Sequence, residues 1–205
     1  LEGFRHLRQF RLFRHLYPET AQWLDEGVEK NHPERLEFIE QALRNTDERV
    51  AEGRPVTPMF LVGVFLWGPM THDARRLQEA EGYTELQAGN IAADSLVQRT
   101  NDIVFMPKRF SYPMREMLQL QPKFNRTKGK RAMSMLGHPR FRAAYDLMLL
   151  RQILGEVDAT TADWWTEIQT KPEAEQARAF GAAKAAKEDA ENAARRRPRR
   201  RRRKT

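Results

Sequence analysis

Residues 57–69, TPMFLVGVFLWGP, decide how this chain folds, because they contain its longest apolar run. Thr57 is a favourable N-cap and Pro58 suits the first helical position, so this start favours a helix over a strand. A segment that is apolar on all sides is buried, and we expect it to be the central helix of the core. The run Met59–Trp67 has nine residues, about half of the roughly 20 that a bilayer-spanning helix needs.

Upstream of this run, the apolar residues recur at helical spacing. A first helix is predicted up to Pro18, and a polar loop then leads to a second helix that begins near Pro33. The apolar positions of these two helices are Leu7, Phe10, Leu12 or Phe13, Leu16, Leu36, Ile39 and Leu43. The first helix is expected to leave apolar surface exposed.

Downstream of the run, Gly68-Pro69 is expected to end the central helix. Residues 71–102 are rich in helix formers, with bends expected at Gly82 and Gly89. Prolines then divide the chain into short pieces over 112–120, 126–136 and 139–154, and Thr161 is a plausible cap for a last packed helix. From Pro172 the composition predicts a solvated helix or an extended arm.

These patterns predict an all-α fold, with an irregular multi-helix body and a disordered arginine-rich C-terminal tail. No alternating apolar and polar run occurs, so no sheet is expected. We divide the chain into a mostly acidic helical body (1–103), a basic helical part (104–170), and an Ala/Glu/Lys arm with the arginine tail (171–205). The absence of cysteine excludes a disulfide scaffold and Cys-ligated metal sites.

The net charge of +8 is segregated into blocks. Residues 195–204, RRRPRRRRRK, hold nine of the 36 basic residues, and the remainder has 27 basic against 28 acidic residues. Within that remainder, residues 1–103 carry 12 basic and 17 acidic residues, whereas residues 104–151 carry 11 and 2. Such segregation indicates a polyanionic partner for the basic blocks.

Aromatic residues are interleaved with the basic residues of 104–151, a composition typical of a track for single-stranded nucleic acid. The candidate RNA-binding residues are Lys108, Arg109, Arg115, Lys123, Arg126, Lys128, Lys130, Arg131, Arg140, Arg142, Arg195, Arg196, Arg197, Arg199, Arg200, Arg201, Arg202, Arg203 and Lys204. We assign most of the interleaved aromatics, Phe110, Tyr112, Phe124 and Phe141, to the core. Of Trp164 and Trp165, one is expected in the core and the other is a candidate for base stacking. The alternatives are a plain basic exterior for the block, and an import signal or solubilising end for the tail.

No catalytic constellation is found in the sequence. The one Gly-Lys pair, Gly129-Lys130, lacks the upstream glycine and following hydroxyl of a phosphate-binding loop. The five histidines lack metal-binding spacing, and the paired carboxylates Glu156/Asp158, Glu173/Glu175 and Asp189/Glu191 fall in loops or helices, where such spacing splays them. We therefore expect no catalytic residue and no metal ligand in this chain.

Several stretches keep a characteristic order and separation. They are RQFRLFRHLYPET (8–20), PVTPMFLVGVFLWGPM (55–70), MPKRFSYPMREMLQLQPKF (106–124), GHPRFRAAYDLMLLR (137–151), ADWWTEIQ (162–169) and the arginine tail. Together they resemble the C-terminal part of the bacterial poly(A) polymerases, which are class II nucleotidyltransferases. The segment HPRFRAAYDLMLLR with the following DWW is the most specific part of this resemblance.

The resemblance implies an enzyme that adds AMP from ATP to RNA 3′ ends, which in bacteria promotes RNA turnover. Its Mg²⁺ would be held by two carboxylates in an N-terminal head that carries Gly-Ser followed by Asp-x-Asp, and this chain contains neither motif. We therefore expect a piece without the head, inactive alone, that binds neither ATP nor Mg²⁺. The expected partners are single-stranded RNA 3′ ends and proteins of RNA decay, in the cytoplasm and away from membranes.

Two other interpretations remain open. The chain could be a stand-alone helical protein that binds or anneals RNA, or a DNA-binding protein with a basic tail. Competition between single-stranded RNA and duplex DNA separates these classes. The oligomeric state is left open.

Overall fold

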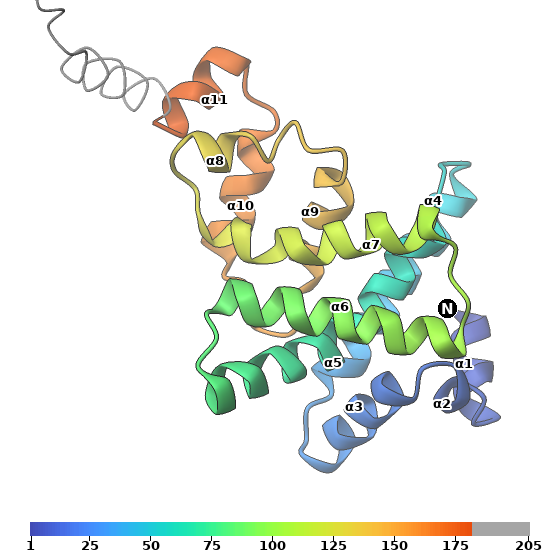
Figure 1. The fold of residues 1–205 in the computed structure, drawn as a ribbon. Coiled ribbons are helices and arrows are strands. Elements are labelled where there is room, and N and C mark those ends of the chain that lie inside the picture. The colour runs from blue at the N-terminus through green and yellow to red at the C-terminus, as the bar shows by residue number, and fades with distance from the viewer. Residues whose placement is uncertain (182–205) are drawn as a thin grey trace, which may run out of the picture.

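The computed structural model describes residues 1–181, and this part consists of helices without any strand, which confirms the all-α prediction (Figure 1). The elements are α1 (Glu2–Gln9), α2 (Phe13–Leu16), α3 (Pro18–Glu29), α4 (Glu34–Ala51), α5 (Pro58–Glu81), α6 (Glu85–Ile103), α7 (Lys108–Leu120), the 3-10 helix η1 (Gln121–Asn125), α8 (Lys130–Met133), α9 (Phe141–Leu150), α10 (Ala159–Ile168) and α11 (Glu173–Ala179). Within residues 1–181, no helix is both long and apolar enough to cross a membrane. The predicted tail at 195–204 lies outside the described residues.

Helix α5 is the central helix, as its apolar run predicted. It packs against α3, α4, α6 and α7, and Val64, Leu66 and Trp67 are buried. The helix begins after Thr57, as expected, but Gly68-Pro69 does not end it. It continues to Glu81 and ends at Gly82, which adopts the left-handed conformation typical of a helix C-cap.

A contact from α3 explains why Pro69 is tolerated inside α5. Proline has no N–H to donate to the carbonyl four residues earlier, so the oxygen of Phe65 loses its helical partner. The hydroxyl of Thr20, on α3, donates to that oxygen at 2.9 Å. Thr20 is itself buried, so the replacement hydrogen bond is protected from water.

Gly68 allows α3 and α5 to approach closely. A Cβ atom at this position would lie 2.3 Å from Cδ2 of Trp23 on α3. We predict that Gly68→Ala lowers the free energy of unfolding by about 1–3 kcal/mol, because the Trp23 ring must move. The matched variant is Gly89→Ala in α6, where no atom lies within 4 Å of the new Cβ.

Gly89→Ala should raise the free energy of unfolding by about 0.5–1 kcal/mol, because alanine loses less backbone entropy in a helix interior. Urea denaturation of both variants measures the difference. Equal effects of the two substitutions would contradict the close approach at Gly68.

The N-terminal segment differs from the single predicted helix. The backbone turns at Arg11, whose φ of 60° breaks the chain into α1 and α2. The turn buries Phe4 and Phe13 and leaves Phe10 65% exposed, so the predicted apolar stripe was wrong at Phe10. The predicted polar loop after Pro18 is also wrong: Pro18 begins α3, as its fixed φ allows.

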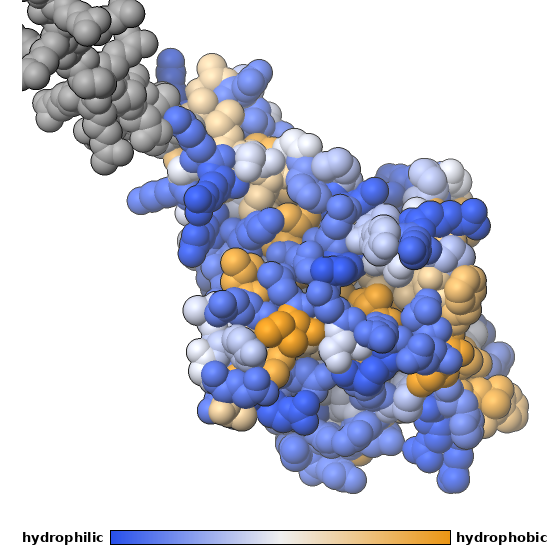
Figure 2. Space-filling model, in the orientation of Figure 1, coloured by the Kyte–Doolittle hydropathy of each residue, from blue (hydrophilic) through white to orange (hydrophobic). Residues whose placement is uncertain are grey.

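Apolar side chains are exposed near this turn, as we expected for the first helix. Leu12 is 51% exposed, and Leu16 lies beside Ile103 at the end of α6. Figure 2 shows apolar surface at the lower right of the molecule, where Figure 1 places α1 and α2.

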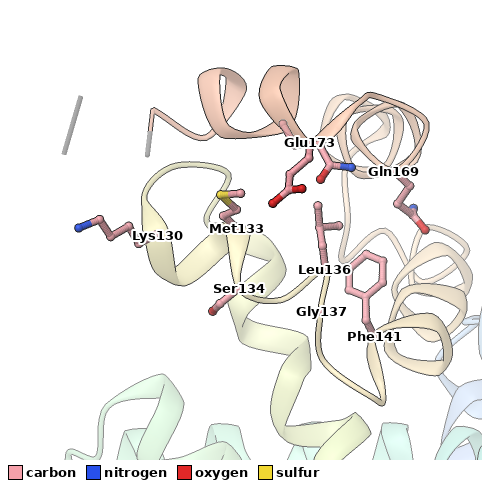
Figure 3. Close-up of a pocket in the computed structure, with 9 residues that line it drawn as sticks. Lys130, Met133, Ser134, Leu136, Gly137, Phe141, Gln169 and Glu173 are labelled. Carbon is pink, nitrogen blue, oxygen red and sulfur yellow. The ribbon is translucent and has the colours of Figure 1, made fainter. Parts of the chain in front are cut away.

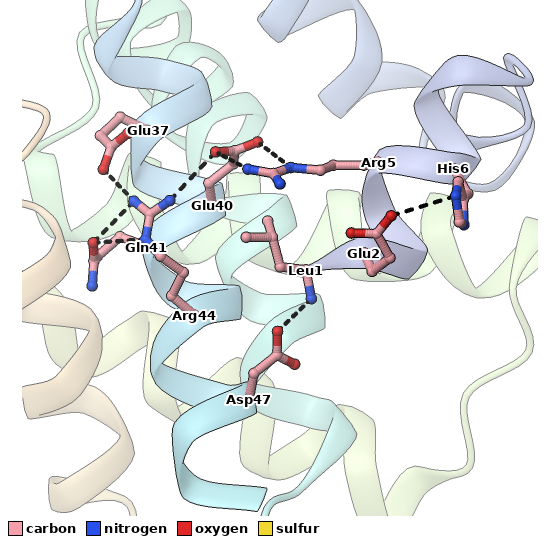
Figure 4. Close-up of polar contacts among 9 residues, drawn as sticks. All are labelled: Leu1, Glu2, Arg5, His6, Glu37, Glu40, Gln41, Arg44 and Asp47. Carbon is pink, nitrogen blue, oxygen red and sulfur yellow. Dashed lines mark hydrogen bonds and ion pairs between the residues drawn. The ribbon is translucent and has the colours of Figure 1, made fainter. Parts of the chain in front are cut away.

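Ion pairs attach α1 to α4 (Figure 4). Nε of Arg5 donates to one carboxylate oxygen of Glu40 at 3.3 Å, and Nη1 of Arg44 donates to the other at 3.4 Å. Arg44 also pairs with Glu37, two turns earlier on α4. Glu40 is thus shared by two guanidinium groups, which fixes α1 against α4.

An aromatic cluster centred on Trp165 forms the core of the C-terminal half. Trp165 is fully buried, and its ring centroid lies 5.1 Å from Phe124, 5.9 Å from Phe141 and 5.9 Å from Phe180. Its indole Nε1 donates to the backbone oxygen of Phe124 at 2.9 Å. Phe180, just after the exposed helix α11, is therefore part of this core.

Candidate nucleic-acid interface

The ten predicted basic residues of 104–151 do not form one continuous row. Helix α7 buries Met114, Met117 and Leu118, and its basic residues Lys108, Arg109 and Arg115 lie outside this buried face. The remaining residues fall at the two ends of α7. We name these two groups the α8 cluster (Lys123, Arg126, Lys128, Lys130 and Arg131) and the arginine groove (Arg109, Arg140 and Arg142, joined by Arg49 and Arg54).

The α8 cluster lies on a short segment that is anchored at two points, Phe124 and Gly129. Phe124 is buried beside Trp165, and the N–H of Gly129 donates to the backbone oxygen of Phe180 at 2.6 Å. The φ of 90° at Gly129 is a conformation that glycine adopts without strain. The chain between these anchors is therefore held in place while its basic side chains point outward.

The side chains of the α8 cluster are exposed, and most of them lack an acidic partner. Within residues 1–181, no carboxylate forms an ion pair with the side chains of Lys123, Arg126, Lys128 or Arg131. A phosphate that binds them has no internal ion pair to displace. These four side chains are therefore exposed cations that carry no ion pair within the described residues.

A hollow beside the α8 cluster lies between α8, α10 and α11 (Figure 3). Met133, Leu136 and Phe141 give it an apolar floor, and the carboxylate of Glu173 points into it, whereas Lys130 points away. A carboxylate repels a phosphate, so this hollow is a poor phosphate site. The positive surface of the cluster faces the solvent beside the hollow.

The arginine groove lies at the other end of α7, where α4, α7 and α9 meet at the upper right of Figure 1. It has a volume of about 720 Å³. Arg49 and Arg54 come from the end of α4 and the loop after it, Arg109 from the first turn of α7, and Arg140 and Arg142 from the start of α9. The apolar part of its lining, which we call the floor, includes Met59, Phe60, Phe110 and Pro113. The carboxylate-bearing residue Glu48 also lines the groove.

Carboxylates form ion pairs with three of the five arginines of the arginine groove. Arg140 pairs with Glu116 at 3.2 Å, Arg142 with Asp146 at 3.1 Å, and Arg54 with Glu52 at 3.0 Å. Arg49 and Arg109 form no ion pair within residues 1–181. Arg49 donates weakly to the carbonyl of Pro55, and the guanidinium of Arg109 lies 5.0 Å from the ring centre of Phe110.

Asp146 is the half-buried acid of the groove. Burial raises the pKa of its carboxyl above the usual value, while the guanidinium groups of Arg142 and Arg49 oppose this rise. Arg49 of α4 and Asp146 of α9 both line the groove, so the two helices bring opposite charges to the same hollow.

The remaining predicted residues lie along α7. Arg115 forms an ion pair with Asp94 of α6, whereas Lys108 is exposed at the start of the helix. Of the interleaved aromatics, Phe124 and Phe141 are buried as we expected, but Tyr112 is 55% exposed.

The adjacent tryptophans differ, as we expected. Trp165 is in the core, and the partly exposed Trp164 packs edge-on against Phe180, with ring centres 5.0 Å apart. That contact occupies one side of its ring. A base-stacking role for Trp164 stays a prediction.

Arg49 and Arg54 were missed by the sequence analysis. They belong to residues 1–103, which carry more acidic than basic residues, so a count of charge by segment does not single them out. Only tertiary packing brings the end of α4 close to α9. The signal that could have found them is the pair of arginines that flanks the break between two helices, immediately before the apolar run.

No metal centre accompanies these surfaces in the described part. Residues 1–181 contain no group of three or more His, Cys, Asp or Glu side chains that could hold a metal ion. The Asp-x-Asp pair expected for Mg²⁺ is absent from the sequence. The described residues therefore do not fit Mg²⁺.

The chain is similar in sequence to known poly(A) polymerases. Residues 81–204 match the family model described as "Polymerase A arginine-rich C-terminus". The chain is 32% identical over 180 residues to poly(A) polymerase I of Salmonella typhi, and 33% identical over 180 residues to that of Escherichia coli O157:H7. Each alignment covers 85% of this chain and 37% of the relative.

A more distant relative shows the same pattern of coverage. Poly(A) polymerase I of Haemophilus influenzae is 31% identical over 170 residues, which cover 82% of this chain and 37% of that protein. The chain thus matches little more than a third of the length of these relatives. The family match begins at residue 81, so the division predicted at residue 103 stays a prediction.

Proposed function

Because this chain belongs to the poly(A) polymerase family, as a member that carries the arginine-rich C-terminus, we propose that it is the RNA-holding part of a polynucleotide adenylyltransferase. Such an enzyme adds AMP from ATP to RNA 3′ ends, and this tailing promotes RNA turnover in bacteria. The observation that carries the proposal is the overlap between the family match and the exposed α8 cluster. The proposed location is the cytoplasm, with proteins of RNA decay as candidate partners.

In this proposal, the chain binds the RNA strand mainly through its phosphates. Lys123, Arg126, Lys128 and Arg131 of the α8 cluster form no ion pair within residues 1–181, and the segment that carries them packs against the Trp165 core. Phosphate contacts carry no sequence information, so we expect little sequence preference. The residues predicted at 195–204 would add salt-sensitive affinity, but they lie outside the described residues.

The chemistry of adenylation is proposed to depend on residues other than those of this chain. ATP and Mg²⁺ would serve the whole enzyme, and the 205 residues alone are expected to be inactive. Incubation of this chain with RNA, ATP and Mg²⁺ should yield no extended RNA. Extension by the 205 residues alone would contradict this part of the proposal.

Removing the charges of the α8 cluster should weaken RNA binding and reduce its salt dependence. The variant replaces Lys123, Arg126, Lys128 and Arg131 with glutamine. Each lost contact lowers the slope of log affinity against log salt by about 0.7, so a fall of up to about 3 is expected. Fluorescence anisotropy with a single-stranded RNA, titrated from low to high salt, measures this slope.

The matched control removes the same charge from exposed arginines outside both surfaces. It replaces Arg11, Arg14, Arg75 and Arg76 with glutamine. The control should keep the wild-type salt slope, because these residues are not expected to touch RNA. An equal loss in both variants would indicate non-specific attraction by net charge, and tighter binding of duplex DNA than of RNA would favour the DNA-binding alternative.

A further inference from the structure

The arginine groove combines two features that the α8 cluster lacks. Its guanidinium groups come from separate elements and surround a hollow of about 720 Å³, and the floor of that hollow is apolar. Arg49 and Arg54 lie on one side, at the end of α4, and Arg140 and Arg142 lie on the other, at the start of α9. Arg109 lies against the ring of Phe110.

These features match the parts of a nucleotide. A planar guanidinium group binds a phosphate through two parallel hydrogen bonds, and it also stacks on a flat ring. Nucleobases present apolar faces that bind beside aromatic and guanidinium planes. A base can therefore lie on the apolar floor near Phe110 and Arg109, while its flanking phosphates meet the arginines of the two walls.

We propose that the arginine groove is a subsite for single-stranded RNA that takes a base as well as its phosphates, and that Arg49 and Arg54 are RNA-binding residues. The inference rests on the proposed function and extends it from the basic part into the body of residues 1–103. The strand then crosses from α9 to α4 over the first turn of α7.

Arg49 and Arg109 are the two groove arginines best suited to a test by substitution. Neither forms an ion pair within residues 1–181, whereas Arg54, Arg140 and Arg142 already pair with carboxylates. A phosphate reaches the first two without displacing an acid. Their replacement also breaks no ion pair, so the fold should survive.

The experiment compares two double variants with the wild type. One is Arg49→Gln/Arg109→Gln, and the control is Arg11→Gln/Arg75→Gln, which removes two exposed arginines without ion pairs. At about 0.1 M salt, the groove variant should bind a 12-nucleotide RNA about tenfold more weakly, and the control should change less than about twofold. Thermal denaturation of all three proteins checks that the fold is kept.

A second probe tests the contact with a base. The wild type should bind the 12-nucleotide RNA more tightly than a ribose-phosphate strand of equal length without bases, and Arg109→Lys should reduce this difference while it keeps the salt slope. Equal losses in the two double variants, or equal binding of both strands by the wild type, would overturn the groove subsite. So would an unchanged RNA affinity of the groove variant combined with loss of binding to polyglutamate, because the groove would then hold an acidic peptide.

The outcomes also separate this inference from the proposed function. If the wild type does not bind RNA, or if the α8 cluster variant keeps its full salt slope, the proposed function fails. If the α8 cluster variant loses affinity as predicted while the groove variant behaves like its control, only the groove inference fails.

Discussion

Replacement of Trp165 by alanine is expected to lower the free energy of unfolding by about 3–5 kcal/mol. The side chain is fully buried among Phe124, Phe141 and Phe180, so its removal leaves a large cavity. It also leaves the backbone oxygen of Phe124 without the indole N–H that donates to it at 2.9 Å. Chemical denaturation followed by circular dichroism measures the loss, with an unchanged dependence on denaturant as the test of two-state unfolding.

The conservative variant Trp165→Phe separates packing from the hydrogen bond. It keeps an aromatic ring in the cluster but removes the N–H, so a smaller loss of about 1–3 kcal/mol is expected. A loss below about 1 kcal/mol for Trp165→Ala would show that the cluster is not a core.

Trp165→Ala should also weaken RNA binding, although Trp165 does not contact the RNA. Phe124 and the bond from Gly129 to Phe180 hold the segment that carries the α8 cluster, and both depend on the packing around Trp165. At a temperature where the variant is still folded, we expect lower affinity with a nearly unchanged salt slope, because the charges remain. A loss of slope as well would instead show that the phosphate contacts of the α8 cluster are themselves lost in the variant.

The fold class was predictable from the sequence because local patterns determine it. The apolar run after Thr57 predicted the central helix α5, and helical spacing elsewhere left no candidate strand. The predicted end at Gly68-Pro69 was wrong for a physical reason that is not local. The hydroxyl of Thr20, which replaces the missing proline donor, is 45 residues from Phe65 in the sequence.

The candidate site was predictable only as a set of charges. Counting the charged residues in each segment identified the α8 cluster, because its five basic residues lie within nine consecutive positions. The same counts gave Arg109, Arg140 and Arg142 of the arginine groove but not Arg49 and Arg54, which reach the groove only through the packing of α4 against α9. Local charge density can be counted in a sequence, whereas convergence across helix ends depends on tertiary contacts.

Arg151→Met is expected to cost about 3–5 kcal/mol of stability, because it breaks a buried ionic network that joins the two halves of the described chain. Arg151 is 8% exposed, and it donates to Glu156 at 3.0 Å and to the side-chain oxygen of Gln121 at 3.2 Å. Its guanidinium lies 4.5 Å from the ring centre of Trp67 on α5. The indole of Trp67 donates to the same oxygen of Glu156 at 2.9 Å.

A double-mutant cycle identifies the origin of this cost. If it comes mainly from leaving the charge of Glu156 without its cation, Arg151→Met/Glu156→Gln should recover part of the stability that Arg151→Met loses. If the cost comes instead from the unpaired amide oxygen of fully buried Gln121, the double variant should recover no stability. Arg151→Lys should then restore only part of the stability, because lysine is a point charge without the planar guanidinium. Strictly additive losses in the cycle would mean that Arg151 and Glu156 do not act as a pair. The network would then contribute through the contact of Arg151 with Trp67 and Gln121, and α5 would be joined to α9 by packing rather than by charge.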